Sequence, residues 1–79
     1  MEIIRIMGTL YTIGERVVVS YLDNYDDEIM TVTGTIEYMG EDIEEECTCF
    51  LMVTDTYGTF MISTNSVTSI MTEKEWEER

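Results

Sequence analysis

Carboxylates are the most numerous side chains in this sequence that could form a binding site. The 79-residue chain holds 17 Asp and Glu against four Lys and Arg, which gives a formal net charge of −13. Thirteen of the acids gather in three short segments. The first holds Asp23, Asp26, Asp27 and Glu28; the second holds Glu41, Asp42, Glu44, Glu45 and Glu46; the third, near the C-terminus, holds Glu73, Glu75, Glu77 and Glu78. Carboxylates at this density bind cations, either metal ions or the Arg and Lys side chains of another protein.

The spacing of the first acidic segment does not fit a calcium loop. An EF-hand needs an oxygen ligand at its third position and glycine at its sixth, where this segment has Tyr25 and Glu28. Weak adventitious binding of Ca²⁺ or Mg²⁺ remains an alternative. Cys47 and Cys49 lack the four-ligand set of a structural zinc site, and the chain has no histidine to complete one. We therefore expect no metal site and no cofactor.

The composition also limits the classes of protein that this chain can belong to. Without histidine the commonest general base is missing, and neither cysteine has a histidine to activate it, so we expect no enzyme activity. A charge of −13 excludes the usual nucleic-acid binder and attachment to an anionic membrane. No segment reaches the length of a transmembrane helix, and the N-terminus lacks the basic start of a targeting signal. Two cysteines two positions apart would form a strained disulfide, so a reducing, cytoplasmic setting is expected.

The remaining composition favours an all-β fold. Thr, Ile and Val fill 27 of the 79 positions, and β-branched residues favour strands over helices. The length allows a single domain, residues 1–79. Alternating side chains and turn residues predict five strands, at residues 16–22, 29–39, 47–54, a run containing Phe60 and Ile62, and 67–71.

Turns and ends are also marked in the sequence. A further edge strand with a turn at Gly8 is expected near the N-terminus, a tight hairpin turn at Asp55-Thr56-Tyr57-Gly58, and a second acidic loop beginning at Gly40. Thr72 and Glu75 have the spacing of a capping box, which predicts a short helical turn in the acidic tail, residues 73–79. A turn of that length needs Trp76 to dock it.

The longest strand carries the clearest sign of curvature. Val32, Gly34, Ile36 and Tyr38 are expected to share one of its faces, and the glycine in mid-strand predicts a bulge or sharp bend, as at a barrel corner. The strand at 47–54 is apolar on both faces, which indicates a central strand or one whose outer face is covered.

These marks resemble the layout of Src-homology-3-like and Sm-like small β-barrels. The resemblance covers residues 14–72 and is carried by Gly14-Glu15-Arg16-Val17-Val18-Val19, Gly34-Thr35-Ile36, the turn at Gly58, and the run from Ser63 to Ile70. It implies a small five-stranded, strongly bent antiparallel sheet or barrel, with a one-turn 3₁₀ element at residues 65–67. It also implies that the two acidic loops flank the same rim, so that nine carboxylates converge.

In overall character the chain resembles phage anti-CRISPR proteins and anti-restriction DNA mimics. A DNA-binding protein engages about 6–10 phosphates, so nine carboxylates are of the right order to occupy its basic groove. The hypothesis is a non-enzymatic inhibitor that binds a basic protein target in place of nucleic acid. The resemblance implies a nuclease of a bacterial defence system as that target. The predicted binding residues are the nine loop carboxylates, with Tyr25 as an aromatic anchor for Arg or Lys.

Four alternatives remain. A small adaptor for basic peptide motifs would use the same carboxylates with Tyr25, Tyr38 and Tyr57. An oligomeric structural subunit, for instance a homodimer, would use the apolar faces of residues 47–54. The acids of solvated loops also keep a small β protein from edge-to-edge association. A halophilic origin is the fourth account of the charge.

Overall fold

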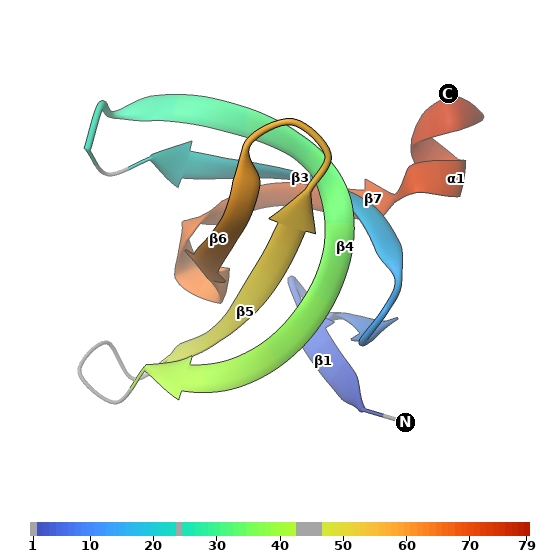
Figure 1. Ribbon diagram of the computed structural model, residues 1–79, viewed down its shortest axis with the longest axis horizontal. Coiled ribbons are helices and arrows are strands. Elements are labelled where there is room, and N and C mark those ends of the chain that lie inside the picture. The colour runs from blue at the N-terminus through green and yellow to red at the C-terminus, as the bar shows by residue number, and fades with distance from the viewer. Residues whose placement is uncertain (1, 24, 43–46) are drawn as a thin grey trace.

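The computed structural model describes residues 2–23, 25–42 and 47–79, without the side chains of Asp42 and Cys47. It consists mainly of strands, with a short 3₁₀ helix and a short C-terminal α-helix (Figure 1). The elements are β1 (Ile3–Ile6), β2 (Thr9–Thr12), β3 (Arg16–Asp23), β4 (Glu28–Asp42), β5 (Cys47–Thr54), β6 (Gly58–Ser63), η1 (Thr64–Ser66), β7 (Val67–Thr72) and α1 (Glu73–Glu77).

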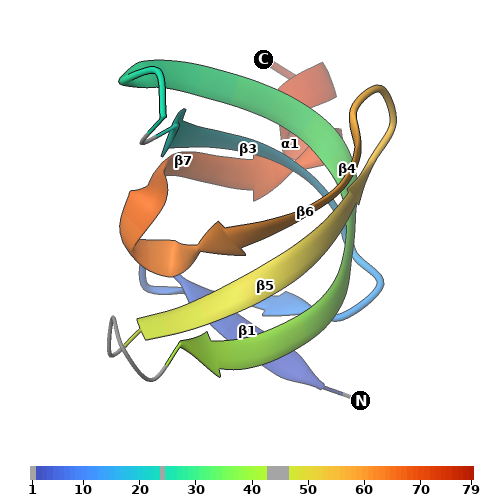
Figure 2. The same ribbon diagram turned by 60° about the vertical axis from the view of Figure 1, so that its left-hand side comes forward.

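Five of the strands form one antiparallel sheet in the order β6-β5-β4-β3-β7. The sheet curls strongly because β4 bends along its whole length, as both views show (Figures 1 and 2). This confirms the predicted bent, five-stranded antiparallel sheet with a short C-terminal helix. The sheet is not closed into a barrel: in the described chain β6 pairs only with β5, and β7 only with β3.

Gly34 permits the curl in the middle of β4. It pairs with Val17 on one side and Thr54 on the other. A Cβ atom at this position would collide with the backbone carbonyl of Val53 and would lie 2.8 Å from the Cα of Thr54. Only glycine allows β5 to approach this closely. The sequence therefore marked a position where the packing of β5 requires glycine, although β4 bends along its whole length and not at Gly34 alone (Figures 1 and 2).

The β-bulge of β4 lies beyond Gly34, between Ile36 and Tyr38. Its extra residue reverses the alternation, so Ile36 is fully buried while Tyr38 is 54% exposed. The expectation that these two side chains share a face is therefore wrong, because a bulge shifts the phase of a strand by one residue. Met39 follows Tyr38, pairs with the buried Phe50, and packs against the core.

The core fills the concave side of the curled sheet and is closed at one end by the β1–β2 hairpin. This hairpin turns at Met7 and Gly8, both with positive φ, as two-residue turns require. The turn predicted at Gly8 is thus present, but the segment forms two strands that pair with each other in a separate two-stranded sheet and not the single edge strand expected. The hairpin contributes Ile4, Ile6 and Tyr11, each no more than 5% exposed, to the core. The main sheet contributes Val17, Val19, Val32, Ile36, Phe50, Met52, Ile62 and Val67.

The remaining turns and caps lie at or next to the positions predicted from the sequence. Residues 55–57 form the hairpin turn, and Gly58 has a φ of 82°. The buried Thr54 holds this turn, because its hydroxyl donates to the Gly58 carbonyl at 2.6 Å and accepts from the Tyr57 amide at 2.9 Å. The 3₁₀ helix η1 begins one residue before the expected position. Thr72 and Glu75 form the predicted capping box at the start of α1.

Candidate functional site

The first acidic segment forms an exposed turn between β3 and β4. Asp23 and Glu28 are the paired residues that close it, and the Asp27 amide donates to the Asp23 carbonyl at 2.8 Å. An Asp23 carboxylate oxygen accepts from the Tyr25 amide at 2.9 Å, which is an Asx turn. Tyr25 is 96% exposed, and the carboxylates of Asp26, Asp27 and Glu28 are exposed beside it.

Asp27 has a φ of 58°, in the left-handed region that Asp and Asn tolerate better than other side chains. The aspartate at this position therefore has a conformational role in the turn as well as a charge. A substitution that tests the charge alone has to avoid this residue.

The second acidic segment is described only at its start. The strand β4 continues to Asp42, so Gly40 and Glu41 belong to a strand and not to the loop expected there. Glu41 is exposed and pairs with Thr48. Glu44, Glu45 and Glu46 lie outside the described residues, as does the side chain of Asp42.

The curvature of β4 determines how these two regions relate. The strand begins at Glu28 and ends at Asp42, and both of its ends point to the same side of the molecule in the two views (Figures 1 and 2). The short helix η1 lies between them. The convergence of nine carboxylates stays a prediction, with its first four members on one exposed turn.

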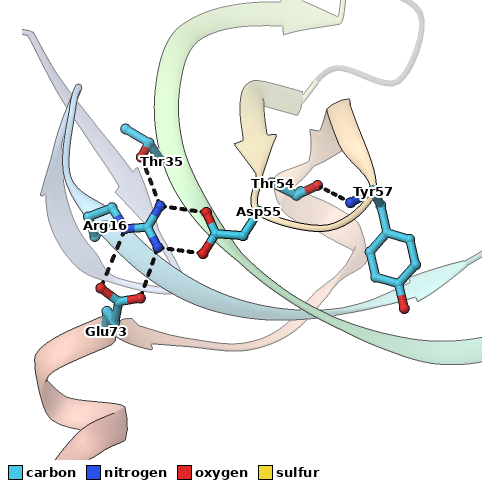
Figure 3. Close-up of polar contacts among 6 residues, drawn as sticks. All are labelled: Arg16, Thr35, Thr54, Asp55, Tyr57 and Glu73. Atoms are coloured by element: carbon cyan, nitrogen blue, oxygen red, sulfur yellow. Dashed lines mark hydrogen bonds and ion pairs between the residues drawn. The ribbon is translucent and has the colours of Figure 1, made fainter.

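A second site, which the sequence did not suggest, is built around Arg16 (Figure 3). Its guanidinium donates to both oxygens of Asp55, at 2.8 and 2.6 Å, and to both oxygens of Glu73, at 3.4 and 2.9 Å. A fifth bond, of 3.4 Å, reaches the Thr35 hydroxyl. One side chain of β3 thus ties together β4, the β5–β6 turn and the first residue of α1.

The ion pairs shift the proton equilibria of their partners in opposite directions. The hydrogen bonds that Arg16 donates to Asp55, and then those to Glu73, raise the pKa of Arg16 above its ordinary value. The hydrogen bonds from Arg16 lower the pKa of Asp55. The Asp55 carboxylate is therefore held in the ionised form beside the guanidinium.

A groove of about 560 Å³ opens between the two segments that Arg16 ties together. One wall is the β5–β6 turn with Tyr57, and the other is α1 with Trp76 and Glu77. The floor is the convex face of the sheet, and includes Val18, which is buried there outside the main core. The lining residues are Val18, Thr31, Val32, Thr33, Thr54, Asp55, Thr56, Tyr57, Glu73, Trp76 and Glu77.

The sequence carried a faint signal for this site. Asp55 is the only charged residue between positions 47 and 72, and Arg16 is one of only four basic residues. Neither observation by itself assigns the two residues to each other, because the chain holds sixteen other acids. Their pairing still depends on the fold, because the two positions are 39 residues apart.

Other kinds of site are not found in the described ranges. Within residues 2–23, 25–42 and 47–79 no group of three or more Cys, Asp or Glu is arranged to hold a metal ion. No helix in this part of the chain is long and apolar enough to cross a membrane. Cys49 is half-buried on β5.

Comparison of the chain with protein-family models, curated proteins and solved structures finds no match.

Proposed function

We propose that this protein is a non-enzymatic inhibitor that binds the basic nucleic-acid groove of a protein target, with carboxylates in the place of phosphates. The observation that carries this proposal is a large excess of unneutralised acid. The side chains of thirteen carboxylates are described, and the two ion pairs among described residues both belong to Arg16. Eleven carboxylates therefore have no basic partner within the described chain.

The charge favours a partner rich in Arg and Lys. Net charges of about 2–8 suffice for the solubility of a small domain, and larger values add self-repulsion. A basic groove gains charge-assisted hydrogen bonds from such a surface, and long-range attraction speeds the encounter. The likeness in character to phage inhibitors makes a nuclease of a bacterial defence system, in the cytoplasm of the host cell, the target class to examine first.

A small adaptor for basic peptide motifs is the second candidate. The observation that favours it is Tyr25, which is 96% exposed among the carboxylates of the β3–β4 turn. An aromatic ring beside carboxylates suits the docking of a single Arg or Lys side chain. The two functions differ in what displaces the partner. DNA competes for a DNA-binding groove, but it does not compete for a basic peptide motif that binds no DNA.

The test is capture followed by displacement. The protein is immobilised, exposed to bacterial lysate at low salt, and washed either with a short DNA duplex or with NaCl of the same ionic strength. Inhibition by DNA mimicry predicts that the captured proteins bind DNA and that the duplex releases them where NaCl does not. Release by an arginine-rich peptide, but not by the duplex, would support the adaptor instead.

A further inference from the structure

The groove between α1 and the β5–β6 turn is acidic and carries aromatic side chains on both walls. It holds the three carboxylates of Asp55, Glu73 and Glu77, and its lining includes no basic residue. Its two aromatic side chains are accessible, with Tyr57 at 57% and Trp76 at 42% exposed. Carboxylates together with open aromatic faces are what a cationic side chain requires, as ion-pair partners and as cation–π surfaces.

The chain's own arginines show which cation these groups accept. The Arg16 guanidinium lies against Asp55 and Glu73 with four hydrogen bonds of 3.4 Å or less. The Arg79 guanidinium lies 4.7 Å from the centre of the Trp76 ring. Both kinds of groove group, carboxylate and indole, are thus contacted by guanidinium within this molecule.

The charge of the groove still favours a further cation after Arg16 is counted. Arg16 offsets one of the three carboxylates and Arg79, which lies over the Trp76 ring, offsets a second, so the groove with both guanidinium groups keeps a formal charge of −1. Glu77 takes no part in the ion pairs of Arg16, and no hydrogen bond or ion pair engages its side chain among the described residues. Its carboxylate lines the groove beside Trp76.

We propose that this groove is an arginine subsite, which takes the guanidinium of an extended segment of the protein's basic partner. Glu77 is the ion-pair partner for that guanidinium, and Tyr57 or Trp76 supplies the surface on which its plane stacks. Arg16 acts as a positioning residue, because its bonds to Asp55 and Glu73 fix how far apart the two walls stand. This inference rests on the proposed function only in that the partner is basic, and it assigns a surface separate from the β3–β4 turn.

The experiment uses the fact that Trp76 is the only tryptophan of the chain. The protein is titrated with the peptide acetyl-Gly-Arg-Gly-amide at constant ionic strength, with Trp76 fluorescence and the NMR shift of its indole N–H as the readouts. The matched probe replaces arginine by citrulline, which has the same shape without the charge. We expect a saturable response to the arginine peptide and a response at least threefold weaker to the citrulline peptide.

Two variants and one control locate the binding. Tyr57→Ala and Glu77→Gln should each weaken binding of the arginine peptide about twofold to fivefold, the range of a cation–π contact or an exposed ion pair. Glu77 is exposed on the helix surface, so Glu77→Gln tests the subsite even if Tyr57→Ala disturbs the turn. Glu37→Gln removes one exposed carboxylate that lies outside the groove lining and outside the acidic segments, and it should leave the affinity unchanged.

The subsite is wrong if neither readout saturates, if the citrulline peptide binds equally well, or if Glu37→Gln weakens binding as much as Glu77→Gln. That failure is distinguishable from failure of the proposed function. Partners that DNA displaces would still be captured by Glu77→Gln and Tyr57→Ala variants if only the subsite is wrong.

Discussion

Arg16 and Asp55 share two parallel hydrogen bonds, from Nη1 to Oδ1 at 2.8 Å and from Nη2 to Oδ2 at 2.6 Å, although they lie 39 positions apart. The same guanidinium holds Glu73 at the start of α1. Bidentate pairs that belong to a network are the surface ion pairs that contribute measurably to stability. In this small domain the pair also connects the two walls of the groove.

Replacing Arg16 by glutamine should lower the thermal unfolding midpoint by a few degrees, because it leaves Asp55 and Glu73 close together without a cation. The matched control is Arg5→Gln, which changes the net charge equally and removes an exposed arginine with no ion pair among the described residues. Equal midpoints for the two variants in thermal unfolding would show that the Arg16 network does not stabilise the fold.

Asp55 should make stability depend on pH in acid. Because Arg16 lowers its pKa in the folded state, its contribution is fully present above its unfolded pKa of about 4 and is lost as the pH falls through the folded pKa. In urea unfolding, the stability difference between the wild type and Asp55→Asn should therefore shrink as the pH falls below about 4. A difference that stays constant to lower pH would contradict this.

Gly34→Ala should be one of the most damaging small substitutions in the chain. The added Cβ meets the backbone of β5, which cannot move without breaking the pairing of β4 and β5. Overpacking of this kind costs about 1–3 kcal/mol in the free energy of unfolding. Gly40→Ala is the control, because its Cβ meets only the flexible side chain of Tyr38, at 3.0 Å. Equal losses in the free energy of unfolding, measured by chemical denaturation, would mean that the close approach of β5 does not require glycine at position 34.

Local features of this fold are readable in the sequence, while features that depend on the arrangement of strands are not. The hairpin turn before Gly58 and the capping box of Thr72 each depend on a few consecutive residues, and both were predicted. The bulge before Tyr38 was not, because its position is set by how β4 pairs with β5. The Arg16 clamp was missed for the same reason, since its partners Asp55 and Glu73 lie 39 and 57 positions away in the sequence.

The same distinction between local and long-range features applies to the candidate site. The turn carrying Tyr25 and Asp26 was predicted as an exposed acidic loop, and it is one. The groove was not predicted, because its wall residues Tyr57 and Trp76 come from segments that only the curled sheet brings together.

The cap of α1 should control the environment of Trp76. The Thr72 hydroxyl accepts from the Glu75 amide at 3.1 Å, and a helix of five residues has few other bonds to hold it. Thr72→Val removes this hydroxyl and should lower the free energy of unfolding by about 1 kcal/mol. It should also shift the Trp76 emission toward that of a solvated indole. Thr72→Ser keeps the cap and should retain the wild-type spectrum. Identical spectra for both variants would show that α1 is held by other contacts.

The most direct test of the account compares two charge-reversed variants of equal net charge for capture of partners that DNA displaces. Asp26→Lys with Glu28→Lys changes the β3–β4 turn and leaves Asp27, with its positive φ, in place. Glu2→Lys with Glu37→Lys makes the same change in charge at exposed positions outside all three acidic segments. We expect the first variant to lose capture while its fold is intact by circular dichroism, and the second to retain it. Equal capture by both variants would contradict a surface of carboxylates that acts in the place of DNA.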